Sequence, residues 1–217
     1  MQQKIKIWDF AVRFFHWSQV LLLAGLWYTG EQGMMAWHQL LAYTLAAVLL
    51  SRIIWGFCGS QTARFSQFAS TPLQAVRYLR QGHAVAGHNP ASFYMIIALI
   101  LLVLLQLLSG LATFDNSYMS DGPLVSYLPS AWVDAASDFH KLNINLILSG
   151  VAIHVLAALW HSWRHQNVIG AMFTGSARFK APVAAPQLKN SIGYFVVMAL
   201  LLVIFYFWQG QKLLALL

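Results

Sequence analysis

Five runs of apolar residues divide this chain, and their lengths constrain its fold more than any other feature of the sequence. A helix needs about 20 apolar residues to cross the hydrocarbon core of a bilayer. The runs are close to that length and cover residues 10–28, 37–57, 91–114, 139–163 and 192–208. Of the 217 residues, 59% are hydrophobic and only 9% are charged, against about 25% charged residues in soluble proteins. The sequence therefore predicts an all-α integral membrane protein and excludes enzymes built on soluble sheets.

The first run begins among Lys4, Lys6 and Arg13, a pattern similar to the start of a secretory signal. It is longer and more aromatic than such a signal, and no small-residue cleavage site follows it. We therefore expect a retained helix, joined to the second run as an antiparallel hairpin. The predicted organisation is a four-helix transmembrane domain over 1–175, then a cytoplasmic linker and a fifth, C-terminal transmembrane helix over 176–217.

Basic and acidic residues separate when the connecting segments are sorted by the side of the membrane on which they would lie. One side holds 11 of the 13 basic residues: Lys4, Lys6, Arg13, Arg52, Arg64, Arg77, Arg80, Arg164, Arg178, Lys180 and Lys189. The other side holds five of the six acids: Glu31, Asp115, Asp121, Asp134 and Asp138. The positive-inside rule then predicts a cytoplasmic N-terminus, a C-terminus on the outer side and an acidic loop over 115–138 that faces the outer side. The net charge of +7 is thus a topology signal and does not indicate nucleic-acid binding.

The basic 58–90 segment contains the pattern of a short surface helix. Thr71 and Pro72 are typical of an N-cap and first helical position, and Gly82 of a stop. The apolar face, opposite two arginines, consists of Leu73, Val76 and Leu79. We expect this helix to lie on anionic membrane lipid.

Five of the eight histidines lie within the predicted membrane helices, where an ionisable side chain is a candidate functional residue, and four of them are placed at matching depths. His16 is near the inner end of the first run and His38 near the outer start of the second. His140 and His154 are 14 residues apart on the fourth run, which is about 21 Å along a helix and close to a whole number of turns. We therefore expect His38 to meet His140 near the outer surface and His16 to meet His154 near the inner one.

Two imidazoles on facing helices, with no Cys or carboxylate beside them, favour the two axial positions of an iron porphyrin over a tetrahedral metal site. Two such pairs predict two stacked haems with four metal ligands: His16, His38, His140 and His154. Flat macrocycles need backbone clearance, which Gly25 and Gly150 offer. Basic residues near the ligand ends are candidate partners for the haem propionates: Arg13, Arg52 and Lys141.

Alternatives exist for each of these histidines. A single membrane histidine is often an interhelical hydrogen-bonding residue. His161, seven residues after His154 on the same face, competes for the inner site. It lies about 31 Å from His140, a full hydrocarbon thickness, which places it at the interface, so we favour His154. The remaining histidines fall in cytoplasmic loops, where solvated roles are expected: His83, His88 and His165.

Six segments of the chain resemble the bacterial cytochrome b561 family, which includes the b-type cytochrome subunits of nickel-iron hydrogenases. They are WDFAVRFFHW (8–17), WHQLLAYTLAAVLLSRIIWGFCG (37–59), ARFSQF (63–68), GHNP (87–90), FHKLNINLILSGVAIHVLAALWHS (139–162) and NVIGAMFTG (167–175). The resemblance covers about 7–175 and implies two b haems held by one histidine on each of the first two helices and two on the fourth. These positions fall on the same four histidines. The fifth helix, which carries no histidine, departs from the family pattern.

The resemblance also implies electron exchange between a quinone pool and a redox partner. We expect transmembrane electron transfer through two b haems, with a periplasmic c-type cytochrome or a hydrogenase-like subunit as partner. The chain would then be a cytochrome subunit of a quinone-linked oxidoreductase, whether or not it is itself an enzyme. Two alternatives remain: a stand-alone quinone reductase, and a proton-coupled transporter that uses the membrane histidines as relays. A homodimer is also left open.

Overall fold

The computed structural model describes every residue except 1–2, 82–84, 118–119, 165–166 and 181. The long helices are α1 (Phe10–Glu31), α2 (Met35–Cys58), α5 (Pro90–Leu111), α6 (Ser130–Arg164) and α8 (Ile192–Phe205). The short helices are α3 (Phe65–Phe68), α4 (Pro72–Gln81), α7 (Val168–Thr174) and α9 (Gln211–Leu214), with a 3-10 turn at Val125–Tyr127 and a π-helical turn at Tyr206–Gly210. The strands are β1 (Gln3–Lys6), β2 (Phe114–Asp115), β3 (Ser120–Asp121) and β4 (Ser176–Phe179).

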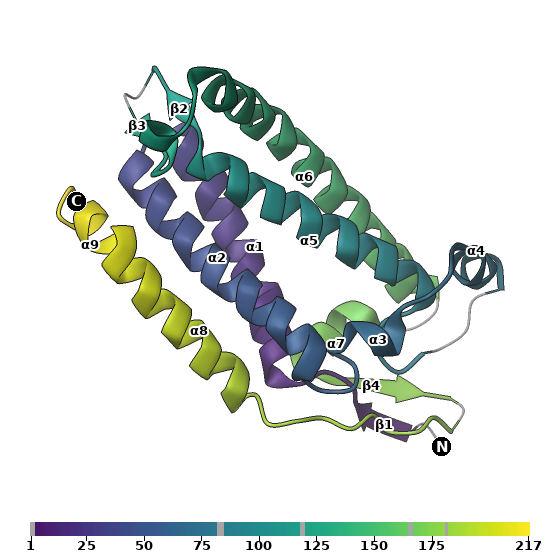
Figure 1. The fold of residues 1–217 in the computed structure, drawn as a ribbon. Helices are drawn as coiled ribbons and strands as arrows, with labels where there is room; N and C mark the ends of the chain where they lie inside the picture. Colours follow the sequence, from purple (N-terminus) through teal and green to yellow (C-terminus); the bar gives the residue numbers. More distant parts are fainter. Residues whose placement is uncertain (1–2, 82–84, 118–119, 165–166, 181) are drawn as a thin grey trace.

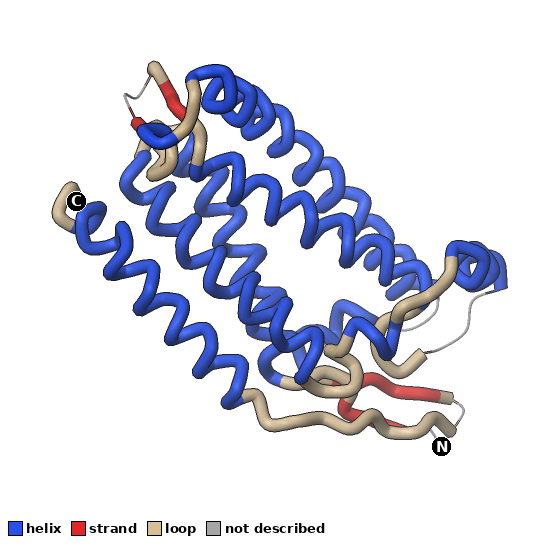
Figure 2. Tube along the Cα trace, viewed as in Figure 1, coloured by secondary structure: helices blue, strands red, loops and turns tan. Residues whose placement is uncertain are grey.

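The long helices form two antiparallel hairpins and one added helix (Figures 1 and 2). Helix α1 packs against α2, α5 packs against α6, and α8 packs on the far side of α2. By contrast, α6 makes only weak backbone contact with α1 and α2. The two hairpins therefore approach each other mainly through side chains, and the predicted α1–α2 hairpin is confirmed.

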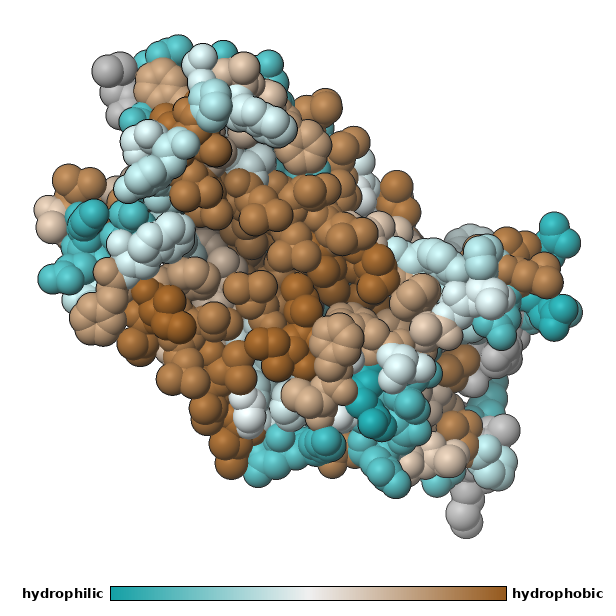
Figure 3. Space-filling model, viewed as in Figure 1, coloured by the Kyte–Doolittle hydropathy of each residue, from teal (hydrophilic) through white to brown (hydrophobic). Residues whose placement is uncertain are grey.

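The surface of the bundle is that of a membrane protein. A hydrophobic face runs across the middle of the molecule, and hydrophilic side chains gather toward its ends (Figure 3). Within the described residues, four helices are long and apolar enough to cross a bilayer: α2, α5, α6 and the α8–α9 segment Ile192–Leu214. Helix α1 is not among them, since Arg13, His16 and Gln19 interrupt its apolar residues. The chain is a multi-pass, helical membrane protein.

The two ends of the bundle differ in composition, and we name them for it. The basic end contains β1, α3, α4, α7 and β4, and the acidic end contains the 32–34 turn and the 112–129 connection. Strands β1 and β4 form an antiparallel ladder in which Lys4 is opposite Arg178, and β2 pairs with β3. These short strands are absent from the all-helical prediction, because neither pair has an alternating apolar pattern long enough to indicate a sheet.

Helix α6 begins at Ser130, nine residues before the predicted start at 139. Its 35 residues give about 52 Å of helix, well beyond a hydrocarbon core of about 30 Å. Asp134 and Asp138 therefore lie on its first turns, and the expected 115–138 loop ends at residue 129. Apolar runs reveal only the part of a helix that lies in lipid, and the polar turns of α6 have no such signal.

Helix α8 is attached to the bundle by specific polar contacts. The Tyr194 hydroxyl donates to the Val48 carbonyl of α2 at 3.2 Å. Before α8, Gln61 and Gln187 exchange two hydrogen bonds, and Lys189 Nζ donates to the Cys58 carbonyl at the end of α2 at 2.8 Å. Residues 187–194 are thus attached to α2 and to the turn that follows it.

Helix α4 agrees with its prediction. Thr71 and Gln74 form a capping box, in which the Gln74 amide donates to Thr71 Oγ1 at 3.3 Å and the Thr71 amide donates to Gln74 Oε1 at 2.9 Å. The predicted apolar face is exposed: Leu73, Val76 and Leu79. The predicted stop, Gly82, lies outside the described residues.

Candidate functional site

The four membrane histidines come together as two pairs at opposite ends of α6. At the basic end, the ring centroids of His16 and His154 are 6.1 Å apart. At the acidic end, those of His38 and His140 are 6.4 Å apart. We call these the basic-end pair and the acidic-end pair. Both pairs span the interface between α6 and the α1–α2 hairpin, where the helix backbones are in weak contact.

These separations fit an axially coordinated metal better than a direct hydrogen bond. A metal bound to a nitrogen of each ring at about 2 Å places the two ring centroids roughly 6 Å apart. The part of the chain that the structure describes contains no cluster of three or more His, Cys, Asp or Glu side chains suited to a metal. A porphyrin supplies four nitrogen ligands of its own, so a pair of histidines suffices to hold haem iron.

At the acidic end, hydrogen bonds orient both rings. His38 Nδ1 lies 2.9 Å from the Leu26 carbonyl, so it carries the proton and leaves Nε2 free to coordinate. His140 Nδ1 lies 3.0 Å from Ser109 Oγ, and that hydroxyl in turn donates to the Gln106 carbonyl. A backbone carbonyl or hydroxyl on the distal nitrogen is the usual arrangement for a metal-binding histidine.

Two glycines leave room for these rings. A Cβ on Gly110 would lie 3.0 Å from Cε1 of His140, and a Cβ on Gly30 would lie 3.4 Å from the His38 ring. The glycines suggested by the sequence pack elsewhere, since Gly25 faces Leu41 and Gly150 faces Leu99. The relevant glycines were missed because the clearance depends on which side chain arrives from a neighbouring helix.

Around the basic-end pair, several buried donors have no partner among the described residues. They are His16 Nδ1, Arg13 Nε, Arg52 Nη1, Arg64 Nε and His88 Nε2. Arg52 is only 2% exposed and lies over the Phe65 ring at 5.1 Å. Arginine only donates hydrogen bonds, so the three arginine nitrogens require acceptors, such as the carboxylates of a haem. This unsatisfied set fits the predicted group.

The predicted propionate partners are placed differently from one another. Arg52 is buried and lies over the ring of Phe15, the residue before His16, and its Nη1 has no partner among the described residues. One nitrogen of Arg13 already has a partner within the protein, because Nη1 donates to the Phe173 carbonyl at 2.8 Å. Lys141 is exposed on α6, next to His140 in the chain. Arg64 was not singled out from the sequence, although the ARFSQF motif contains it.

None of the other described histidines is a member of either pair. His161 stacks on Tyr78 of α4 at 6.3 Å, while His154 faces His16. His83 and His165 lie outside the described residues. The expectation of a solvated loop role for His88 is wrong, because its ring is packed between aromatic side chains and its Nε2 is buried. Its position in a loop did not reveal that the loop folds back against the N-terminal segment.

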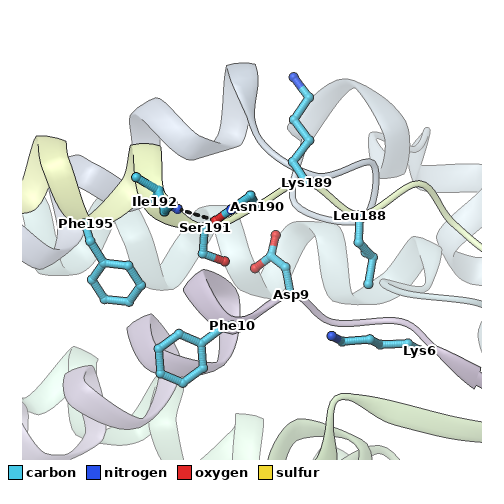
Figure 4. A pocket seen from close by; sticks show the side chains of 9 residues that line it. All are labelled: Lys6, Asp9, Phe10, Leu188, Lys189, Asn190, Ser191, Ile192 and Phe195. Carbon is cyan, nitrogen blue, oxygen red and sulfur yellow. Dashed lines mark hydrogen bonds between the residues drawn. The ribbon is translucent and has the colours of Figure 1, made fainter.

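Asp9, the acid that lies closest to the first helix in the sequence, has a structural role. Its Oδ1 accepts from the Val12 amide at 2.7 Å as the N-cap of α1, and its Oδ2 accepts from Trp55 Nε1 at 3.0 Å. It lines a pocket of about 370 Å³ between the starts of α1 and α8, where Ser191 lies beside it (Figure 4). Ser191 Oγ accepts from the Ala11 amide at 3.0 Å, so this pocket joins α8 to α1.

A helical membrane bundle with histidines facing each other at two levels defines the class of membrane-bound b-type cytochromes of electron transport. The family model for prokaryotic cytochrome b561 matches residues 7–175. The chain therefore belongs to the prokaryotic cytochrome b561 family, whose cofactor is haem b.

A curated relative from Bradyrhizobium diazoefficiens (strain USDA 110) is described as a "probable Ni/Fe-hydrogenase B-type cytochrome subunit". It is 24% identical over 162 residues, which is 66% of this chain and 66% of the relative, slightly less than two thirds of its length. No solved structure matches the chain.

Proposed function

We propose that this chain is a di-haem cytochrome that carries electrons across the bacterial inner membrane, between a periplasmic redox partner and the quinone pool. The observation that carries the proposal is the presence of two facing histidine pairs, 6.1 Å and 6.4 Å apart, at opposite ends of one membrane helix. Bound haem supplies one-electron redox chemistry at its iron, which the protein tunes through ligation, hydrogen bonding and burial.

In this proposal His16 and His154 hold one haem, and His38 and His140 hold the other. Because two histidines would hold each haem, the group would supply one-electron transfer rather than oxygen binding. At the acidic end, Leu26 and Ser109 fix the ring orientations through Nδ1. At the basic end, Arg13 and Arg52 balance propionate charge, and Lys141 has that role at the acidic end.

The membrane orientation follows from charge. We propose five spans, with α1 completing the four apolar helices, a cytoplasmic basic end and a periplasmic C-terminus. Helix α4 would lie on anionic lipid at the cytoplasmic surface. A reporter enzyme that works only in the periplasm should be active when it is fused after Leu217. A reporter that works only in the cytoplasm should be inactive at the same position. Activity only of a cytoplasmic reporter would show that α8 does not span in this direction.

The redox partner is proposed to dock at the acidic end. The curated relative is described as a hydrogenase cytochrome subunit, which supports a hydrogenase-like partner, and the acidic side chains suit a basic c-type cytochrome. Either partner makes this chain the membrane subunit of a quinone-linked oxidoreductase.

Haem stoichiometry and spectrum test the proposal together. The purified protein should contain two haems per chain and give the reduced-minus-oxidised spectrum of low-spin b haem. It should also be reduced by a quinol, with no change on exposure to carbon monoxide, because both axial positions are occupied. One haem per chain, or a carbon-monoxide-sensitive spectrum, would contradict the assignment of two histidine-paired sites.

A further inference from the structure

The GHNP segment (residues 87–90) leads into α5, and local backbone geometry explains three of its four residues. Gly87 has a φ of 114°, a conformation that L side chains rarely adopt. Asn89 is the N-cap of α5, where its Oδ1 accepts from the Ser92 amide at 2.8 Å. Pro90 occupies the first turn, where no amide donor is needed. The remaining residue, His88, has no role in this turn.

The ring of His88 is held in a fixed place. It packs between Trp8 at 4.6 Å and Phe68 at 4.5 Å, measured between ring centroids. Trp8 is itself fixed by its amide, which donates to the Gly175 carbonyl at 3.1 Å. An aromatic environment of this kind would accept a phenylalanine, yet the buried Nε2 of His88 has no hydrogen-bond partner among the described residues. Buried polar atoms in native proteins are nearly always paired, so this nitrogen calls for a partner that the described residues do not supply.

The same region contains other donors in the same condition. Arg52 Nη1 and Arg64 Nε are buried and unpaired. Arg52 lies over Phe65, whose ring is 5.9 Å from that of Phe68, the residue that supports His88. Burial lowers the pKa of His88 to about 3, and neighbouring positive charges, with Arg52 the strongest, act in the same direction. The imidazole is therefore neutral at physiological pH and offers a hydrogen bond without a charge.

We propose that His88 Nε2–H, together with the guanidinium groups of Arg52 and Arg64, binds one carboxylate of the haem held by the basic-end pair. A carboxylate accepts up to about four hydrogen bonds and supplies the negative charge that buried arginines require. Arg52 also lies over the ring of Phe15 at 5.8 Å, the residue before His16 in the chain, which links this group of donors to the helix that carries the basic-end ligand. The proposal rests on the assignment of a haem to this pair, and it gives the GHNP segment a function as part of the haem site.

Variants of His88 in the full-length membrane protein test the proposal. His88→Leu removes the donor, whereas His88→Gln keeps an N–H donor. Loss of the donor leaves more negative charge on the haem carboxylate and disfavours the reduced iron. We expect His88→Leu to favour the oxidised basic-end haem about tenfold, a shift of about 59 mV for a one-electron couple, with the acidic-end haem unchanged. Transfer of the basic-end haem to apomyoglobin should also accelerate, and His88→Gln should restore both properties in large part.

Phe68→Leu is the matched packing control, because it loosens the support of His88 and keeps the imidazole. If Phe68→Leu and His88→Leu give equal shifts, the effect is one of packing and the proposal is wrong. An unchanged potential in His88→Leu with slower reduction by quinol would mean that Nε2 serves a quinone, which also overturns it. If His154→Ala retains both haems, the underlying haem assignment fails, and this result is distinct from either outcome.

Discussion

Each histidine pair has one member on α6, but the two pairs differ in how many of the surrounding polar atoms have hydrogen-bond partners. At the acidic end, His38 and His140 each have a partner for Nδ1, and two glycines make room for the rings. At the basic end, His16 Nδ1 and nitrogens of Arg13, Arg52 and Arg64 have no hydrogen-bond partner among the described residues. The described residues thus satisfy the ring nitrogens of the first pair and leave donors without acceptors at the second.

The difference indicates how each site would control its haem. Hydrogen bonds to the ligands make the acidic-end imidazoles more basic, which favours oxidised iron. Buried positive charge near the basic-end pair favours reduced iron. If each pair holds a haem, as proposed, the basic-end haem would have the higher potential, and electrons would move from the acidic end to the basic end.

The largest expected effect is the loss of one site at a time. His154→Ala should reduce the haem content from two per chain to one and leave the spectrum of the acidic-end haem intact, because the pairs share no ligand. His161→Ala is the matched control, since its ring stacks on Tyr78. Haem assay against protein concentration gives the ratio. Loss of a haem in His161→Ala, with both retained in His154→Ala, would reverse the ligand assignment.

A second substitution addresses the difference in potential. Arg52→Met removes a buried positive charge while keeping much of the side-chain volume. We expect the reduction potential of the basic-end haem to fall by at least about 59 mV, which corresponds to a tenfold change in its reduction equilibrium. The potentials of the two haems should then converge. Lys141→Met, at an exposed position, should shift the acidic-end haem far less. Redox titration followed at the haem bands measures both, and equal small shifts would refute the role of buried charge.

The clearance at the acidic end can be reduced by one methyl group. Gly110→Ala places a Cβ 3.0 Å from His140 Cε1, so the ring must shift by a few tenths of an ångström and the acidic-end haem should bind more weakly. Gly150→Ala is the matched control. Its Cβ would lie 3.0 Å from the end of the flexible Leu99 side chain, and alanine gains about 1 kcal/mol of helix propensity over glycine. Haem retention on dilution should therefore fall in the first variant only. Equal retention in both would show that Gly110 is a packing residue.

The smallest expected effect concerns partner docking. Asp134 and Asp138 are exposed on the first turns of α6, near His140, and should attract a basic redox partner. Reduction of the acidic-end haem by a basic c-type cytochrome should slow as salt rises, because screening shortens to about 8 Å at physiological ionic strength. Asp134→Asn with Asp138→Asn should flatten that dependence, whereas Glu31→Gln should alter it less. A rate insensitive to salt and charge would point to a permanent apolar interface.

The sequence predicted the helices and the meeting of the histidine rings because both depend on regular periods. Apolar runs marked α1, α2, α5 and α8 within a few residues, and 14 residues of helical spacing placed His140 and His154 on one face. Contacts between distant segments were not predictable. The β1–β4 pair, the packing of His88 and the clearance at Gly110 each depend on which residues arrive from another part of the chain, and a single sequence contains no local signal for that.

The pairing of β1 with β4 has a consequence for the order in which the molecule is completed during synthesis. Every residue of the acidic-end pair has been made once the ribosome passes His140, and the remaining ligand follows at His154. Strand β1 stays without its partner until Phe179 has been made. The β1–β4 ladder is therefore one of the last backbone contacts to form among the residues up to 179.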